Sequence, residues 1–82
     1  MMDQELLARI VIDPKVMVGK PVIRGTRLTV TFILGLLAHG QTVKEIVAEY
    51  EGLEEADIQA CLVFARESVG SATYWPLQAT GA

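Results

Sequence analysis

The sequence has little of what catalytic, cross-linked or metal-stabilised domains require. Its 82 residues include one cysteine and one histidine, so neither an internal disulfide nor a multi-cysteine zinc site can form. Aromatic residues make up only 6% of the chain against 51% for all hydrophobic residues, so aliphatic side chains must build the core. A chain of this length predicts one domain with a small core. We expect it to need no cofactor and no metal.

Long hydrophobic runs are also missing. The longest, from Phe32 to Ala38, is far shorter than the roughly 20 residues that a membrane-spanning helix needs. The N-terminus, from Met1 to Glu5, lacks the basic and apolar regions of a secretory signal. Together with the single cysteine, these features predict a cytoplasmic protein that does not enter a membrane.

No set of residues suited to catalysis is evident. His39 follows an apolar segment, where a cation favours a helix C-terminus, so a capping or surface role is the simpler interpretation. Cys61 falls in an apolar stripe and is predicted to be a core residue. Gly19-Lys20 fails as a phosphate loop, because Pro21 replaces the required hydroxyl residue and Pro14 replaces the first glycine. We therefore expect no enzymatic activity.

Charge is distributed unevenly along the chain. The net charge is −3, yet residues 1–30 carry five basic side chains against three acidic ones. Residues 41–67 carry two basic side chains against seven acidic ones. An anionic partner would therefore approach the first half and be repelled by the second.

The first thirty residues predict short extended segments joined by turns. Residues 9–12 are rich in β-branched side chains and indicate a strand, and residues 16–18 suggest another extended piece. Residues 22–23 and 27–29 flank Arg24-Gly25-Thr26, which predicts a tight hairpin with Gly25 at a positive φ angle. Such a hairpin would hold its arginines in fixed positions.

Three helices are predicted after the hairpin. The first covers about Val30 to His39, with Thr29 or Thr31 as its cap; the second begins at a capping box formed by Thr42 and Glu45. The third covers about residues 54–69, and glycines follow all three helices. The three-residue turn 51–53 between the last two helices is typical of a helix-turn-helix. The predicted fold is mainly α: a short N-terminal β-hairpin followed by a three-helix, homeodomain-like bundle over residues 1–70.

Two further segments suggest contacts outside this domain. The first helix is apolar all round, so Phe32 and Leu36 are candidates for a dimer interface. Residues 71–82 form a tail with an aromatic cluster, and its candidates for partner binding are Tyr74, Trp75 and Leu77. The alternative is that this tail folds back over its own domain.

Nucleic-acid binding has one candidate surface. The first turn of the third helix carries Glu54, Glu55 and Asp57, which phosphate would repel, so this helix is a poor reader of DNA. The basic residues of the hairpin region are the remaining candidates: Arg9, Lys20, Arg24 and Arg27. The alternative is that Arg24 and Arg27 pair with the acidic helices of the same chain.

One run of residues resembles a known family. Gly19-Lys20-Pro21-Val22-Ile23-Arg24-Gly25-Thr26-Arg27, preceded by Ile10-Val11-Ile12-Asp13-Pro14, is similar to the signature of the domain-of-unknown-function 433 family. The likeness continues through the helices to about Glu67. The chain departs from the family pattern at Glu54, where a serine or threonine is usual, and at Glu51, where proline is frequent.

The resemblance implies a function as well as a fold. Members are described as antitoxins encoded beside a PIN-like nuclease toxin, which implies toxin neutralisation and binding of operator DNA. We accordingly expect a PIN-like nuclease partner, contacted through Tyr74, Trp75 and Leu77, and a homodimer. The alternative function is a homodimeric interaction module without a DNA or toxin role.

Overall fold

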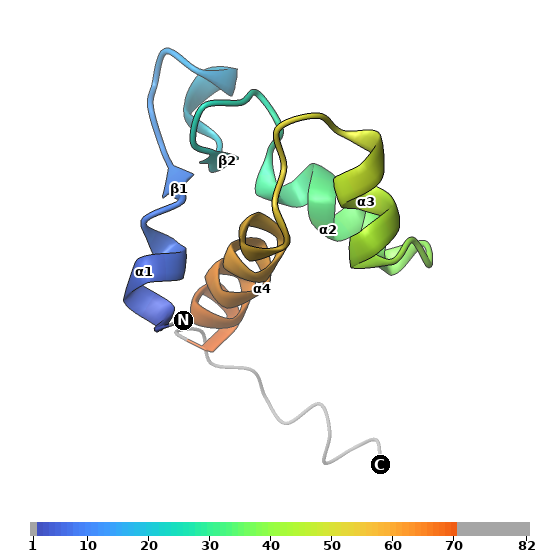
Figure 1. The fold of residues 1–82 in the computed structure, drawn as a ribbon. Coiled ribbons are helices and arrows are strands. Elements are labelled where there is room, and N and C mark those ends of the chain that lie inside the picture. The colour runs from blue at the N-terminus through green and yellow to red at the C-terminus, as the bar shows by residue number, and fades with distance from the viewer. Residues whose placement is uncertain (1, 71–82) are drawn as a thin grey trace, which may run out of the picture.

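The computed structural model describes residues 2–70, which form a mainly helical domain with a short antiparallel strand pair near the N-terminus (Figure 1). Its helices are α1 (Asp3–Leu7), α2 (Val30–Ala38), α3 (Val43–Glu49) and α4 (Glu55–Gly70). The strands are β1 (Ile10–Val11) and β2 (Val22–Ile23), and a 3₁₀ helix, η1 (Met17–Gly19), lies between them. None of the helices within residues 2–70 is long and apolar enough to cross a membrane.

The predicted hairpin region forms, with a different pairing. The partner of β2 is β1, with Ile10 opposite Ile23 and Val11 opposite Val22. The predicted return strand at residues 27–29 contributes only an isolated bridge between Val22 and Thr29. The expectation that residues 22–23 and 27–29 form a regular strand pair is therefore wrong, because Leu28 and Thr29 turn at once into α2.

The turn itself is confirmed. The Ile23 N–H donates to the Leu28 carbonyl at 3.0 Å, and the Thr26 N–H and hydroxyl both donate to the Ile23 carbonyl. Thr26 Oγ1 also accepts from the Leu28 N–H at 2.9 Å. Gly25 has a φ of +82°, a conformation that glycine adopts without steric cost. The sequence Arg24-Gly25-Thr26 thus makes a turn that is closed by its own hydrogen bonds.

Of residues 16–18, which were predicted to be extended, only Val16 is extended. Met17 and Val18 have φ angles of 48° and 55°, which place both in the left-handed region within η1. The Gly19 and Lys20 N–H groups then donate to the carbonyls of Val16 and Met17. A β-branched propensity favoured extension here, but the tight return from β1 to β2 requires a compact turn instead.

The N-terminal helix α1 was not predicted from the sequence. It is a single five-residue element that lies along α4 (Figure 1), with Leu6 buried between them. Arg66 of α4 donates to the carboxylate of Asp3, which joins the two helices at their far end. Five residues are too few to show a helical period, so tertiary contacts stabilise α1 rather than its own pattern.

The three predicted helices are confirmed with their caps. Thr29 Oγ1 accepts from the Phe32 N–H at 3.0 Å, and Thr42 with Glu45 forms the predicted capping box. Gly40 and Gly52 follow α2 and α3 with φ angles of +96° and +91°, as the sequence indicated. Local chemistry therefore sets the ends of these helices.

The core joins all of these elements around α4. It contains buried aliphatic residues from β2, α2, α3, the turn before α4, and α4 itself: Ile23, Val30, Ile33, Ile46, Leu53, Ile58 and Cys61. Figure 1 shows α1 on one side of α4 and the α2–α3 pair on the other. β2 is part of this core, whereas Arg24 and Arg27 on the turn that follows it are exposed.

Cys61 is a core residue, as predicted, and its thiol gives a first testable result. Burial, and secondarily the carboxylate of Asp57, raise the pKa of Cys61 from 9.0 to about 12. The unfolded chain loses this proton more easily, so the stabilisation is fully present below pH 9 and declines as the pH rises from 9 towards 12. We expect wild type to lose more stability than Cys61→Ala between pH 8 and pH 10.5 in urea titrations.

An aromatic disulfide reagent should label the Cys61 thiol only when the protein unfolds. Rapid labelling of the folded protein would contradict the burial of this thiol.

Candidate functional site

A pocket lies where η1, the turn after β2 and the start of α2 meet. Its lining consists of Met17, Arg27, Leu28, Thr29 and Phe32, and its volume is about 260 Å³. Arg27 is the one charged residue in this lining, and most of the rest is apolar. We use the name hairpin surface for this pocket together with Val18, which follows Met17 in the chain. It can accept an apolar side chain beside a positive charge.

Val18 is the most unusual residue of the hairpin surface. Its side chain is 91% exposed although it is a valine, and its φ of 55° is rare for a β-branched residue. Such strain costs about 1–3 kcal/mol and is concentrated at binding sites in known structures. Exposure means that no internal packing compensates for the strain. No sequence signal marks Val18, because the turn and not the residue type sets its conformation.

Phe32 is held in place by another helix. Its ring meets that of Tyr50 edge-to-face, with centroids 5.7 Å apart, and 42% of the residue remains exposed. Leu36, the second candidate for a dimer interface, packs in part against the core of its own chain. The two residues therefore lie in different surroundings: Phe32 presents a rigid apolar face, and Leu36 mainly supports the fold.

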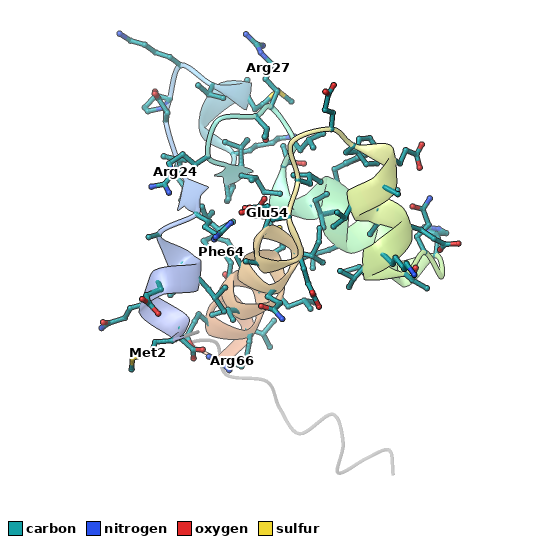
Figure 2. The ribbon with its side chains drawn as sticks, in the orientation of Figure 1. Met2, Arg24, Arg27, Glu54, Phe64 and Arg66 are labelled. Atoms are coloured by element: carbon teal, nitrogen blue, oxygen red, sulfur yellow. The ribbon has the colours of Figure 1, made fainter. Side chains whose placement is uncertain are left out.

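Three of the four candidate cations are exposed at the hairpin. Lys20, Arg24 and Arg27 are exposed, and none of them forms an ion pair within residues 2–70. Figure 2 shows Arg24 beside the strand pair and Arg27 at the far end of the turn, so they are separate charges rather than a cluster. An extended anionic surface would be needed to contact both.

Arg9 has a different role. Its Nη1 donates to Glu54 Oε1 at 2.8 Å and to Asp57 Oδ1 at 3.0 Å. These hydrogen bonds, first to Glu54 and then to Asp57, raise the pKa of Arg9 above its ordinary value. The pairing with the acidic helices that was considered for Arg24 and Arg27 is thus made by Arg9. No sequence signal connects positions 45 and 48 residues apart, so only the folded structure could reveal it.

The start of α4 is acidic and combines a buried carboxylate with exposed ones. Asp57 is 7% exposed, and its Oδ2 accepts from the Glu54 N–H at 2.8 Å, which is the half of a capping box that the third helical residue supplies. Glu54 and Glu55 remain exposed and acidic. Phosphate would meet negative charge at this end of the helix, so the expectation that α4 is a poor reader of DNA stays a prediction.

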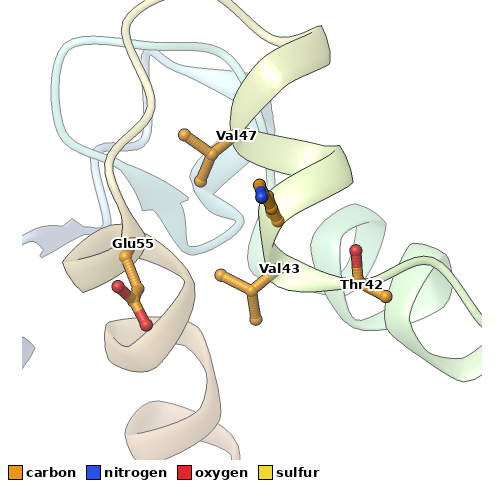
Figure 3. Close-up of a pocket in the computed structure, with 5 residues that line it drawn as sticks. Thr42, Val43, Val47 and Glu55 are labelled. Carbon is orange, nitrogen blue, oxygen red and sulfur yellow. The ribbon is translucent and has the colours of Figure 1, made fainter.

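A second, larger pocket lies between α3 and the start of α4 (Figure 3). Its volume is about 490 Å³, and its lining comprises Thr42, Val43, Lys44, Val47 and Glu55. Two valines provide apolar contact, while Lys44 and Glu55 provide opposite charges. An uncharged side chain of a partner would fit this lining better than an anion would.

Two predictions remain, for His39 and for the C-terminal tail. His39 is exposed at the end of α2, where its Nδ1–H donates to the Gly35 carbonyl at 2.8 Å, in agreement with a capping role. The tail candidates Tyr74, Trp75 and Leu77 lie outside the described residues. Their predicted contact with a partner stays a prediction.

Residues 2–70 form a small helical domain, and its hairpin surface lies where η1 and the turn after β2 meet the start of α2. A family model described as "Protein of unknown function (DUF433)" matches residues 10–65, and the chain belongs to this family. It is similar to a solved structure of a DUF433 member protein from Anabaena variabilis, with 31% identity and a TM-score of 0.72. That match covers 83% of this chain and 67% of the other. No curated protein matches the chain.

Proposed function

We propose that the protein is an antitoxin that binds a PIN-like nuclease toxin in the cytoplasm. The family resemblance supplies the class of partner. The observation that carries the proposal is the hairpin surface, which comprises an exposed, strained valine and an apolar pocket with an arginine in its lining. A neutralising protein needs a rigid complementary surface and no chemistry of its own.

The hairpin surface has the composition of a binding hot spot. Phe32 supplies a fixed aromatic face, Arg27 supplies a cation, and Val18 projects from a turn held by backbone hydrogen bonds. Interfaces favour aromatic residues and arginine at their centres, and preformed geometry reduces the entropy lost on binding. We place the principal contact here, with the tail residues Tyr74, Trp75 and Leu77 as the second predicted contact.

A Val18→Asn variant separates binding from folding. Asparagine tolerates the left-handed conformation better than valine, so we expect the free energy of unfolding to rise by about 0.5–1 kcal/mol in urea titrations. The same change removes an exposed apolar contact, so less partner should be recovered from the native host with tagged protein. If Val18→Asn lowers stability, the strain argument is wrong.

Copurification tests the identity of the partner. Wild type should recover a PIN-like nuclease identified by mass spectrometry, and Phe32→Ala should recover at least about tenfold less. A variant lacking residues 71–82 tests the tail in the same assay, and Glu67→Ala on the exposed side of α4 is the matched control. Repeated recovery of the homodimer alone would contradict the antitoxin proposal and support the interaction module.

Operator binding is a second proposal, supported by the exposed cations of the hairpin. Lys20, Arg24 and Arg27 are the candidates, because Arg9 is paired with α4. With DNA from upstream of the protein's own gene, Arg27→Ala should weaken binding and reduce the slope of log affinity against log salt by about one. Unchanged affinity and slope would exclude Arg27 as a DNA contact.

A further inference from the structure

The outer edge of β1 is an unpaired strand edge. β2 has β1 on one side and the Thr29 bridge on the other, whereas β1 has a neighbour on one side only. The Arg24 N–H donates to the Arg9 carbonyl at 2.7 Å, so Arg9 and Arg24 form a hydrogen-bonded pair of the ladder. Hydrogen-bonded and non-hydrogen-bonded pairs alternate along an antiparallel ladder, so the next pair, Ile10 with Ile23, is non-hydrogen-bonded. The N–H and carbonyl of Ile10 therefore point away from β2.

The same alternation directs the backbone of Ile12 outward. Neither Ile10 nor Ile12 has a backbone hydrogen bond outside the β1–β2 ladder among residues 2–70. Val11 and Ile12 are also 36% and 59% exposed, so the edge presents apolar side chains along with its polar backbone. Natural proteins usually protect such edges with charge or proline, and here the first proline comes only at Pro14.

We propose that a second copy of this chain pairs with β1, antiparallel and about a two-fold axis at Val11, to make a four-stranded sheet. In this register Ile10 lies opposite the partner's Ile12, and Ile12 opposite the partner's Ile10. The outward N–H and carbonyl groups of both residues then form about four hydrogen bonds between the chains. This proposal is independent of the proposed function.

Charge favours a second copy in this register. Arg9 comes to lie opposite the partner's Asp13, and the reciprocal pair forms by symmetry. Within residues 2–70, Arg9 pairs with the start of α4 through Nη1, and Asp13 accepts the Lys15 N–H through Oδ1. Each group therefore retains atoms for the new contact. Opposite charges placed across a strand pair stabilise it.

Neighbouring registers are weaker. A shift of one residue places the outward N–H and carbonyl groups of Ile10 or Ile12 opposite the partner's Val11. The backbone groups of Val11 face β2 instead, so no ladder of hydrogen bonds forms. A shift of two residues in one direction pairs Ile10 with the partner's Pro14, which lacks a donor. The shift in the other direction pairs Ile12 with the partner's Ala8, which ends α1 and is not extended. The pairing about Val11 is therefore the best one available.

A cysteine at the two-fold axis tests the register directly. Val11 and the partner's Val11 form a non-hydrogen-bonded pair, whose Cα separation of about 4.5 Å is within the range of disulfides. We expect Val11→Cys to form a cross-linked dimer at least about tenfold faster than Leu62→Cys under the same mild oxidation. Leu62 is a suitable control because it is 47% exposed on α4, and the native Cys61 is buried. Equal rates would overturn the proposed register.

A backbone variant tests the interface without disturbing the domain. Ile12→Pro removes an N–H that faces the partner and leaves the β1–β2 ladder intact, so the far-ultraviolet circular dichroism should be unchanged. In sedimentation equilibrium at about 100 µM, we expect at least a tenfold loss of dimer affinity. Phe32→Ala should retain the dimer. A wild type that is monomeric throughout, or a dimer lost in Phe32→Ala and kept in Ile12→Pro, would overturn the proposal; the latter would instead support the α2 interface predicted from sequence.

Discussion

Asp57→Ala is expected to lower the free energy of unfolding by about 3 kcal/mol. Asp57 is nearly buried, and its two oxygens accept from the Glu54 N–H and from the Arg9 guanidinium. Removing the carboxylate leaves the Glu54 N–H at the start of α4 without its acceptor and leaves Arg9 without its less exposed partner. Hydrogen bonds of this kind, made to a charged group, contribute about 1.5–3 kcal/mol each. Urea titration followed by circular dichroism measures the change.

Two further variants separate the two roles of Asp57. Asp57→Asn retains an oxygen that can accept from the Glu54 N–H but loses the charge, so it should retain part of the lost stability. Glu54→Gln is the matched control, because the Glu54 side chain is 69% exposed and its ion pair with Arg9 should contribute at most about 1 kcal/mol. If Glu54→Gln costs as much as Asp57→Ala, the stabilising role assigned to the Asp57 carboxylate is wrong.

Ile33→Ala should have a comparably large effect, about 3–4 kcal/mol. Ile33 lies on the buried face of α2 and is fully buried in the core. Its truncation to alanine removes buried apolar surface and leaves a cavity. Thermal or urea unfolding measures the loss.

The adjacent residue provides the control within the same helix. Phe32→Ala removes an edge-to-face contact with Tyr50 and part of an already exposed ring, so it should cost about 1.5 kcal/mol. We expect Ile33→Ala to impair stability and Phe32→Ala to impair partner binding. A Phe32→Ala variant that destabilises as much as Ile33→Ala would mean that this residue serves the core rather than a partner.

The helical part of the fold follows from short-range sequence signals. Thr29 and the Thr42–Glu45 pair begin two helices, and Gly40 and Gly52 end them, because capping and left-handed turns depend on residues only a few positions apart. The Gly25 turn was predictable for the same reason. These residues determine their own local conformation.

The β region was less predictable. Two-residue strands carry almost no periodic signal, so the choice of β1 rather than residues 27–29 as the partner of β2 could not be read from alternation. Helix α1 was missed because five residues do not complete two turns. The conformation of Val18 contradicts its own propensity, since the connection around it requires a tight turn.

The sequence by itself determined the three main helices, the hairpin turn and the family, because each depends on neighbouring residues. Only the tertiary structure decided which arginine pairs with the acidic helix. Arg9 meets Glu54 and Asp57 across more than forty residues because β1 packs beside the start of α4, while Arg24 and Arg27 remain exposed on the turn. Such long-range pairs depend on how elements pack, and no local pattern encodes them.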